Sequence, residues 1–84
     1  MIYTVKWDTA ARTDLKKLDY KTAEKIIIKV DEYLVQDPQG LGKPLSHKYA
    51  GLLRYRFGNY RVIYEITKCN EIIIIKVGHR KDIY

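Results

Sequence analysis

The 84-residue sequence contains one cysteine, two histidines and no long apolar run. A lone Cys69 excludes an intrachain disulfide, and His47 and His79 do not complete the spaced Cys/His pairs of a structural metal site. The longest purely aliphatic run, Ile72 to Ile75, is far too short to span a bilayer. We therefore expect no metal, no cofactor, no membrane segment and a reducing, cytoplasmic location.

Acidic residues are sparse, and one long segment has none. The chain has 16 Lys and Arg against 10 Asp and Glu, a formal net charge of +6. No carboxylate occurs between Pro38 and Tyr64, whereas the basic residues there are Lys43, Lys48, Arg54, Arg56 and Arg61. A basic excess indicates a polyanionic partner, most often nucleic acid, although many small proteins are basic for solubility alone.

The length allows one small domain. The hydrophobic content of 46% excludes intrinsic disorder, and a second core could not be built from so short a chain. We expect residues 1–84 to form a single domain. The first six residues alternate as in a strand and do not form a charged leader before an apolar run, so we expect no signal peptide.

The sequence begins with a strand pattern followed by a helix pattern. Residues 2–7 alternate, which predicts a partly buried strand whose inward side chains are Tyr3, Val5 and Trp7. Asp8 or Thr9 can cap a helix that stops near Asp19, and its apolar positions, at helical spacing, are Ala11, Leu15 and Leu18.

A second helix follows directly. Asp19 or Thr22 can cap it, and it ends near Gln36 because proline disfavours helical geometry in the residue before it, at Asp37-Pro38. Its wide apolar stripe consists of Ala23, Ile26, Ile27, Val30, Tyr33 and Leu34. Two glycines and a second proline then predict an irregular basic loop.

From residue 52 onward the apolar period becomes two. The pattern predicts strands over residues 52–57, 60–67 and 71–77, and Gly58-Asn59 between the first two is a hairpin signal. The order β-α-α-β-β-β predicts an α+β fold in which a two-helix hairpin packs on one face of a small, mainly antiparallel sheet. The other face is then available for function.

The Gly58-Asn59 turn determines which side chains share a face. In a two-residue turn Phe57 lies opposite Tyr60, and Arg56 lies opposite Arg61. One face then carries an apolar set that should pack under the helices: Leu53, Tyr55, Phe57, Tyr60, Val62 and Tyr64. The other face carries Arg54, Arg56 and Arg61 beside Ile63.

Three clustered arginines are costly without a counterion. Directly opposed like charges destabilise a strand pair by up to about 1 kcal/mol, and only Glu65 offers compensation on this face. Guanidinium groups are always charged, and their forked donors match phosphate oxygens. The pattern favours an anion site; the alternative is that the guanidiniums extend into water while their stems lie over apolar atoms.

Two segments carry a family resemblance. Residues 52–65, LLRYRFGNYRVIYE, and residues 77–84, VGHRKDIY, resemble the RelE branch of the RelE/ParE toxin superfamily. The likeness extends to the strand-like start, the helical hairpin and the Lys43-Pro44-Leu45 loop. It implies a RelE-like fold and a toxin of a type II toxin-antitoxin pair. It further implies an mRNA interferase, an endoribonuclease that cuts mRNA in the ribosomal A site without a metal and so inhibits translation.

The implied reaction has definite chemical requirements. When the ribose 2′-hydroxyl attacks the neighbouring phosphorus, one proton must be removed, extra negative charge stabilised and the leaving 5′-oxygen protonated. The resemblance implies that Arg61 and Arg80 hold the scissile phosphate, that Arg54 takes the base or charge-stabilising role and that Tyr84 orients or protonates. Leu52 and Arg54 replace lysines of the archetypal RelE, and a guanidinium is a poor base.

His79 is the natural group to transfer the proton. The unperturbed pKa of histidine, about 6.5, suits acid and base work, and related toxins use a C-terminal histidine this way; the alternative is a surface histidine flanking Arg80. Arg56, Lys43 and Lys48 extend the basic surface toward mRNA and ribosomal RNA. The two lysines are equally consistent with an ordinary solvated loop.

The resemblance also implies a partner, a RelB-like antitoxin that wraps this basic domain in a heterodimer or heterotetramer. Two other functions fit the same architecture. A ParE-like toxin inhibits DNA gyrase without hydrolysing anything, and a degenerate member only binds RNA or its antitoxin. The set of Arg54, Arg61, Arg80 and Tyr84 favours RNA cleavage, because a gyrase binder needs no phosphate-and-acid cluster.

Overall fold

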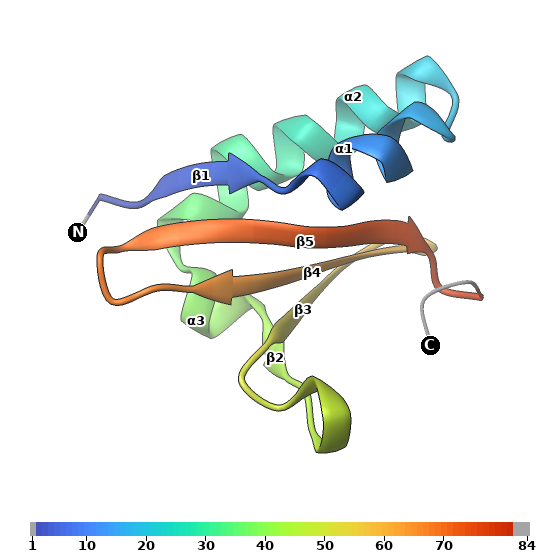
Figure 1. Cartoon of the computed structure of the whole chain (residues 1–84). Helices are drawn as coiled ribbons and strands as arrows, with labels where there is room; N and C mark the ends of the chain where they lie inside the picture. Colours follow the sequence, from blue (N-terminus) through green and yellow to red (C-terminus); the bar gives the residue numbers. More distant parts are fainter. Residues whose placement is uncertain (1, 82–84) are drawn as a thin grey trace.

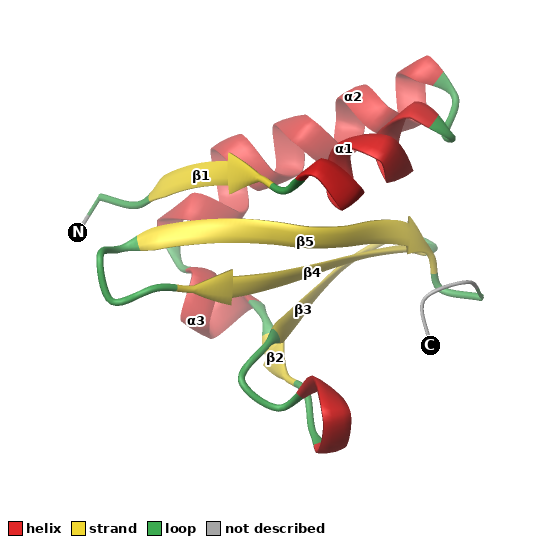
Figure 2. Cartoon of the chain, viewed as in Figure 1, coloured by secondary structure: helices red, strands yellow, loops and turns green. Residues whose placement is uncertain are grey.

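The computed structural model describes residues 2–81 and shows a five-stranded sheet with helices packed on it (Figures 1 and 2). The strand order is β1-β5-β4-β3-β2. Strand β1 (Thr4–Trp7) is parallel to β5 (Glu71–His79), whereas β4 (Tyr60–Ile66), β3 (Leu53–Phe57) and β2 (Lys43–Pro44) continue the sheet antiparallel. The predicted α+β class and mainly antiparallel sheet are confirmed.

Helices α1 (Thr9–Lys16) and α2 (Tyr20–Ile28) form the predicted hairpin at the β1–β5 side of the sheet (Figure 1). Asp19 caps α2: its carboxylate accepts the backbone N–H of Thr22 at 3.2 Å and the Thr22 hydroxyl at 2.6 Å. These two hydrogen bonds lower the pKa of Asp19. The helix then continues through a π-helical turn, Lys29–Tyr33, and a 3-10 turn, Leu34–Gln36, so it ends where predicted.

The apolar stripe predicted for this helix is partly wrong. Ile26, Val30 and Leu34 are fully buried, but Ile27 is 37% exposed and Tyr33 is 51% exposed. The buried residues recur at i, i+4 and i+8 through the π-helical turn, whereas Ile27 and Tyr33 lie at the two edges of this stripe. The Lys29 ammonium lies 4.3 Å from the Tyr33 ring centroid and 5.4 Å from that of Phe57.

The loop predicted after residue 38 contains short regular elements. It begins with α3 (Pro38–Leu41), continues through β2 and makes a 3-10 turn over His47–Tyr49. The Asp37 carboxylate caps α3 by accepting the Gly40 N–H at 3.0 Å. Strand β2 pairs with β3, which places this basic segment at an edge of the sheet.

The core lies between the helices and one face of the sheet. Its fully buried members come from α1, the α2 helix and its continuation, β4 and β5: Ala11, Ile26, Val30, Leu34, Val62, Tyr64, Ile72, Ile74 and Val77. The side chains predicted to face inward from β1 and the hairpin pack against this cluster: Tyr3, Val5, Trp7, Leu53, Tyr55, Phe57 and Tyr60. Both predicted inward faces are thus confirmed.

Tyr64 connects the sheet to α3. Its buried hydroxyl donates to the carbonyl oxygen of Pro38, and burial raises the pKa of the hydroxyl. Gly42 passes so close that an added Cβ would overlap the Tyr64 hydroxyl oxygen. This contact fixes the chain immediately before Lys43 and therefore sets the position of β2.

The far end of β5 is covered by α1. The pairing with β1 ends at Trp7 and Ile74, where the Asp8 N–H donates to the Ile74 carbonyl at 2.9 Å. Beyond that point the Asp14 carboxylate oxygen Oδ2 accepts the Val77 N–H at 3.0 Å. A side chain of α1 thus replaces the missing strand partner of β5.

We predict that Tyr64→Phe lowers the free energy of unfolding by roughly 1–3 kcal/mol, because the Pro38 carbonyl loses its buried donor. Urea denaturation measures this change. Tyr20→Phe is the matched control: Tyr20 is 80% exposed, and its loss of a hydroxyl should change stability by less than about 0.5 kcal/mol. Equal effects of the two substitutions would contradict the structural role of the Tyr64 hydroxyl.

We predict that Gly42→Ala also destabilises the protein, by about 1–3 kcal/mol, because the new methyl group overpacks against Tyr64. The double variant with Tyr64→Phe should lose less than the sum of the two single changes, since the overlapping oxygen is then absent. A denaturant-based double-mutant cycle measures the difference. Strict additivity would show that Gly42 and Tyr64 do not interact.

Candidate functional site

The register of the β3–β4 hairpin places three arginines on the sheet face away from the helices. Arg56 lies directly opposite Arg61, and Arg54 lies opposite Ile63, as the Gly58-Asn59 turn predicts. Gly58 adopts a positive φ of 58°, a conformation that favours glycine in such turns. The predicted pairing is confirmed in every strand position of the hairpin.

Two lysines join these arginines from the neighbouring strands. Lys43 of β2 lies opposite Arg54, and Lys76 of β5 lies opposite Ile63. Paired residues share a side of the sheet. We call the resulting surface the basic face; its residues are Lys43, Arg54, Arg56, Arg61 and Lys76.

A bulge in β5 brings Lys76 to this face. Tyr64 pairs with Ile74 but Ile63 pairs with Lys76, so Ile75 is an extra residue on β5. A bulge shifts the alternation of the strand that carries it. Sequence reasoning missed Lys76 because the run of isoleucines before it gives no signal for the position of a bulge.

The arginine stems cover an apolar residue. Ile63 is only 2% exposed although it lies on the face away from the core. The Nε atoms of Arg54 and Arg61, on either side of it, are also buried. The stems therefore pack over Ile63, as long basic side chains commonly do. This packing restricts the guanidinium groups to a small region of the face.

The carboxylates of this face lie at its other end. Glu65 pairs with Ile73, and Glu71 binds Lys6 of β1 at 2.8 Å. That hydrogen bond and charge contact raise the pKa of Lys6. Arg54 makes no hydrogen bond or ion pair with any residue from 2 to 81. Near the hairpin turn, Arg54 therefore has no acidic partner among residues 2–81.

The end of β5 separates the other predicted site residues. His79 lies opposite Tyr60, so it falls on the helix side of the sheet, whereas Gly78 lies opposite Arg61 on the basic face. The His79 and Tyr60 rings meet edge to face with centroids 5.5 Å apart, and His79 Nδ1 accepts the Lys81 N–H at 3.2 Å. The structure thus does not group His79 with Arg54 and Arg61.

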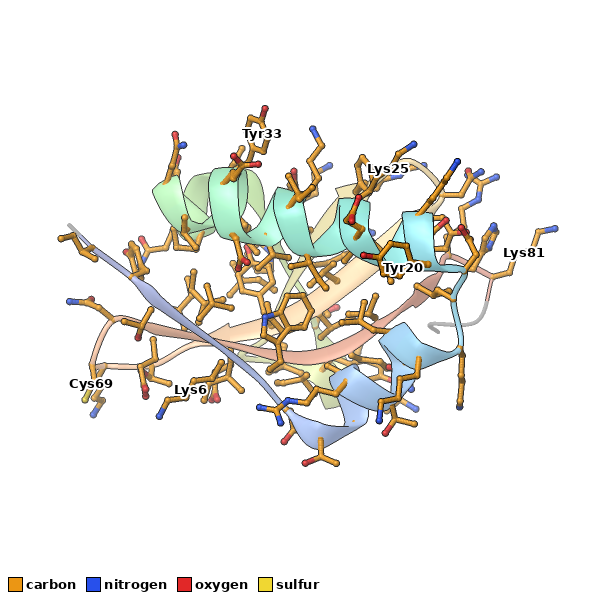
Figure 3. The ribbon with its side chains drawn as sticks, turned by 90° about the horizontal axis from the view of Figure 1, so that it is seen from above. Lys6, Tyr20, Lys25, Tyr33, Cys69 and Lys81 are labelled. Atoms are coloured by element: carbon orange, nitrogen blue, oxygen red, sulfur yellow. The ribbon has the colours of Figure 1, made fainter. Side chains whose placement is uncertain are left out.

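Arg80 continues the pairing beyond β5. It lies in the turn that follows the strand, and its N–H donates to the Asn59 carbonyl at 2.8 Å, which holds it beside the β3–β4 turn. Figure 3 shows Lys81, the next residue, at the opposite end of the molecule from Cys69. Tyr84 lies outside the described residues.

Lys48 lies apart from the paired strands. It belongs to the 3-10 turn before β3, and its ammonium lies 5.2 Å from the Tyr49 ring centroid. Within residues 2–81, no group of three or more His, Cys, Asp or Glu side chains is arranged to hold a metal ion. None of the helices in that range is long and apolar enough to cross a membrane.

Sequence comparison identifies relatives over nearly the whole chain. Residues 5–84 match the family described as ParE toxin of type II toxin-antitoxin system, parDE. Toxin RelG of Mycobacterium tuberculosis is 38% identical over 100% of this chain and 98% of its own. Toxin RelE of the same organism is 39% identical over 90% of this chain and 78% of its own.

Structure comparison agrees. A chain of the RelBE2 toxin-antitoxin complex from M. tuberculosis superposes with a TM-score of 0.90 and 34% identity, covering 95% of this chain and 100% of that one. A double Arg-to-Ala mutant of E. coli toxin RelE in the free state, at 20% identity, has a TM-score of 0.75 over 96% of this chain and 86% of its own, and shows the shared fold. The chain belongs to this family of toxins of type II toxin-antitoxin systems and, within the RelE/ParE superfamily, to its RelE branch.

Proposed function

We propose that this toxin is an endoribonuclease that cuts mRNA in the A site of the ribosome and is held inactive by a RelB-like antitoxin. The observation that carries the proposal is the basic face. Arg56 opposite Arg61, with Arg54 beside them, concentrates positive charge that matches a bound phosphate. A similar chain forms part of a toxin-antitoxin complex named RelBE2, which supports the antitoxin as partner.

The proposed reaction uses the RNA as its own nucleophile. The 2′-oxygen forms a bond to the neighbouring phosphorus while the bond from phosphorus to the 5′-oxygen breaks, which leaves a 2′,3′-cyclic phosphate and a 5′-hydroxyl. The 2′-hydroxyl gives up one proton, and the leaving oxygen takes one. We include no metal ion and no cofactor, because the protein has only to move protons and stabilise charge.

The guanidiniums of Arg54, Arg61 and Arg80 are the proposed charge stabilisers. Fixed cationic donors stabilise the extra negative charge that develops on phosphorus oxygens in the transition state, and the packing of stems over Ile63 limits how far Arg54 and Arg61 move. Arg56, Lys43 and Lys48 are proposed to contact RNA phosphates without reading sequence.

The proton-transfer groups are proposed to come from the end of β5 and the residues after it. His79 offers an imidazole and Tyr84 a phenolic hydroxyl, and both kinds of group can transfer protons. Because His79 lies on the helix side of the sheet, it reaches the RNA only around the end of β5. The scissile phosphate would therefore lie near Gly78, between the two faces.

We predict that Arg61→Ala and Arg80→Ala each reduce mRNA cleavage by about 10²–10³-fold, the loss typical of removing one donor to transition-state charge. The measurement is induction in a bacterial cell, with new mRNA 5′ ends mapped by primer extension on a translated message and on its start-codon-deleted copy. Lys25→Ala removes one exposed positive charge from α2 (Figure 3) and should leave cleavage unchanged.

Two outcomes would contradict the proposal. Full toxicity of both arginine variants, with the fold intact by circular dichroism, would exclude the basic face as the active site. Growth arrest with no new 5′ ends would exclude mRNA cleavage; inhibition of DNA gyrase, measured by a supercoiling assay, would then be the function, as the ParE name of the matched family suggests.

A further inference from the structure

A groove lies at the open edge of β5, where α1 approaches the end of the sheet. It has a volume of about 410 Å³, within the range of small-ligand sites. Its wall includes residues from α1, the turn after it, β4 and both faces of β5: Asp14, Lys17, Tyr60, Lys76, Gly78 and His79. The groove therefore begins on the basic face, at Lys76 and Gly78, and continues to the helix side.

The groove combines aromatic and basic groups. Tyr60 and His79 meet edge to face, and rings of this kind serve as stacking surfaces for unpaired RNA bases. Lys17 and Lys76 are exposed, and neither forms an ion pair with a residue that the structure describes. A groove lined by both aromatic rings and ammonium groups is complementary to a nucleotide, which presents a base and a phosphate.

We propose that this groove binds one nucleotide of single-stranded RNA, adjoining the phosphate held on the basic face, and that Asp14 selects bases carrying an amino group. The inference deepens the proposed function and rests on it. The base lies against Tyr60 and His79, and its phosphate lies toward Lys17 and Lys76. In this position the ribose is next to His79, which explains how a histidine on the helix side reaches the RNA.

The selectivity follows from the hydrogen bonding of Asp14. Its Oδ2 accepts the Val77 N–H at 3.0 Å, and no group in residues 2–81 donates to its Oδ1. A carboxylate oxygen only accepts, so it pairs with the amino group of cytosine, adenine or guanine and repels the O4 of uracil. Cytidine and uridine are nearly identical in shape, so a difference between their affinities reports hydrogen bonding to Asp14 and not steric fit.

The test is a titration of the full-length ¹⁵N-labelled protein with cytidine 3′-monophosphate and uridine 3′-monophosphate, followed by amide chemical shifts. Neither nucleotide contains a scissile bond, so binding is measured independently of cleavage. We expect shifts at Val77, Gly78 and His79, and a Kd about tenfold lower for the cytidine nucleotide, the effect of one charge-assisted hydrogen bond.

Three variants separate the contributions. Asp14→Asn keeps an acceptor for the Val77 N–H but offers an amide donor in place of Oδ1, so it should abolish or reverse the preference for cytidine. Lys17→Ala and Lys76→Ala should each raise the Kd of both nucleotides by the same factor, about threefold. Lys16→Ala, which removes the same charge from α1 outside the groove, should have no effect.

Absence of shifts at Val77, Gly78 and His79 would overturn the inference, even if residues of the basic face respond. An unchanged ratio of the two Kd values in Asp14→Asn would overturn the selectivity. Groove binding together with intact mRNA in the primer-extension experiment would support the groove and contradict the endoribonuclease. Cleavage without groove binding would support the endoribonuclease and overturn the nucleotide site in the groove.

Discussion

The burial of one side of the β3–β4 hairpin is the constraint on which the remainder of this molecule depends. Tyr55, Val62 and Tyr64 share the face that the helices cover, so their neighbours in the sequence must occupy the opposite face. Those neighbours include Arg54 and Arg61. The hydrophobic effect in a small core thus holds together positive charges that would move apart in a free peptide.

The two layers of the protein are linked through Tyr64. This residue contributes to the core and also bonds the chain before β2, so the sheet face that carries the arginines and the loop that supplies Lys43 are positioned by the same side chain. The proposed active site is therefore supported by the core and not by surface contacts alone. Loss of core packing would therefore change the geometry of the basic face.

Much of this arrangement follows from the sequence. The alternation around Gly58-Asn59 predicts both faces of the hairpin, and Asp19 with Thr22 predicts the start of α2, because these signals are local. The exposure of Tyr33 and the placement of His79 and Lys76 could not be predicted. The placement of His79 and Lys76 depends on a bulge in β5, and the exposure of Tyr33 depends on how far the core covers the edge of the helix stripe. The groove beside Asp14 depends on how α1 meets β5, which is a tertiary contact.

The extra residue Ile75 has an evolutionary consequence. In a regular strand, Val77 would face the arginines and Lys76 would face the core. Because of the bulge, every residue after Ile75 lies on the opposite face of the sheet from the one it would otherwise occupy. Gain or loss of one codon at this point would therefore swap the chemistry of the two sides of the sheet end without any substitution in the residues concerned. Insertions and deletions in the last strand, more than point changes, are a direct route by which such toxins could acquire a different set of groups around the same phosphate.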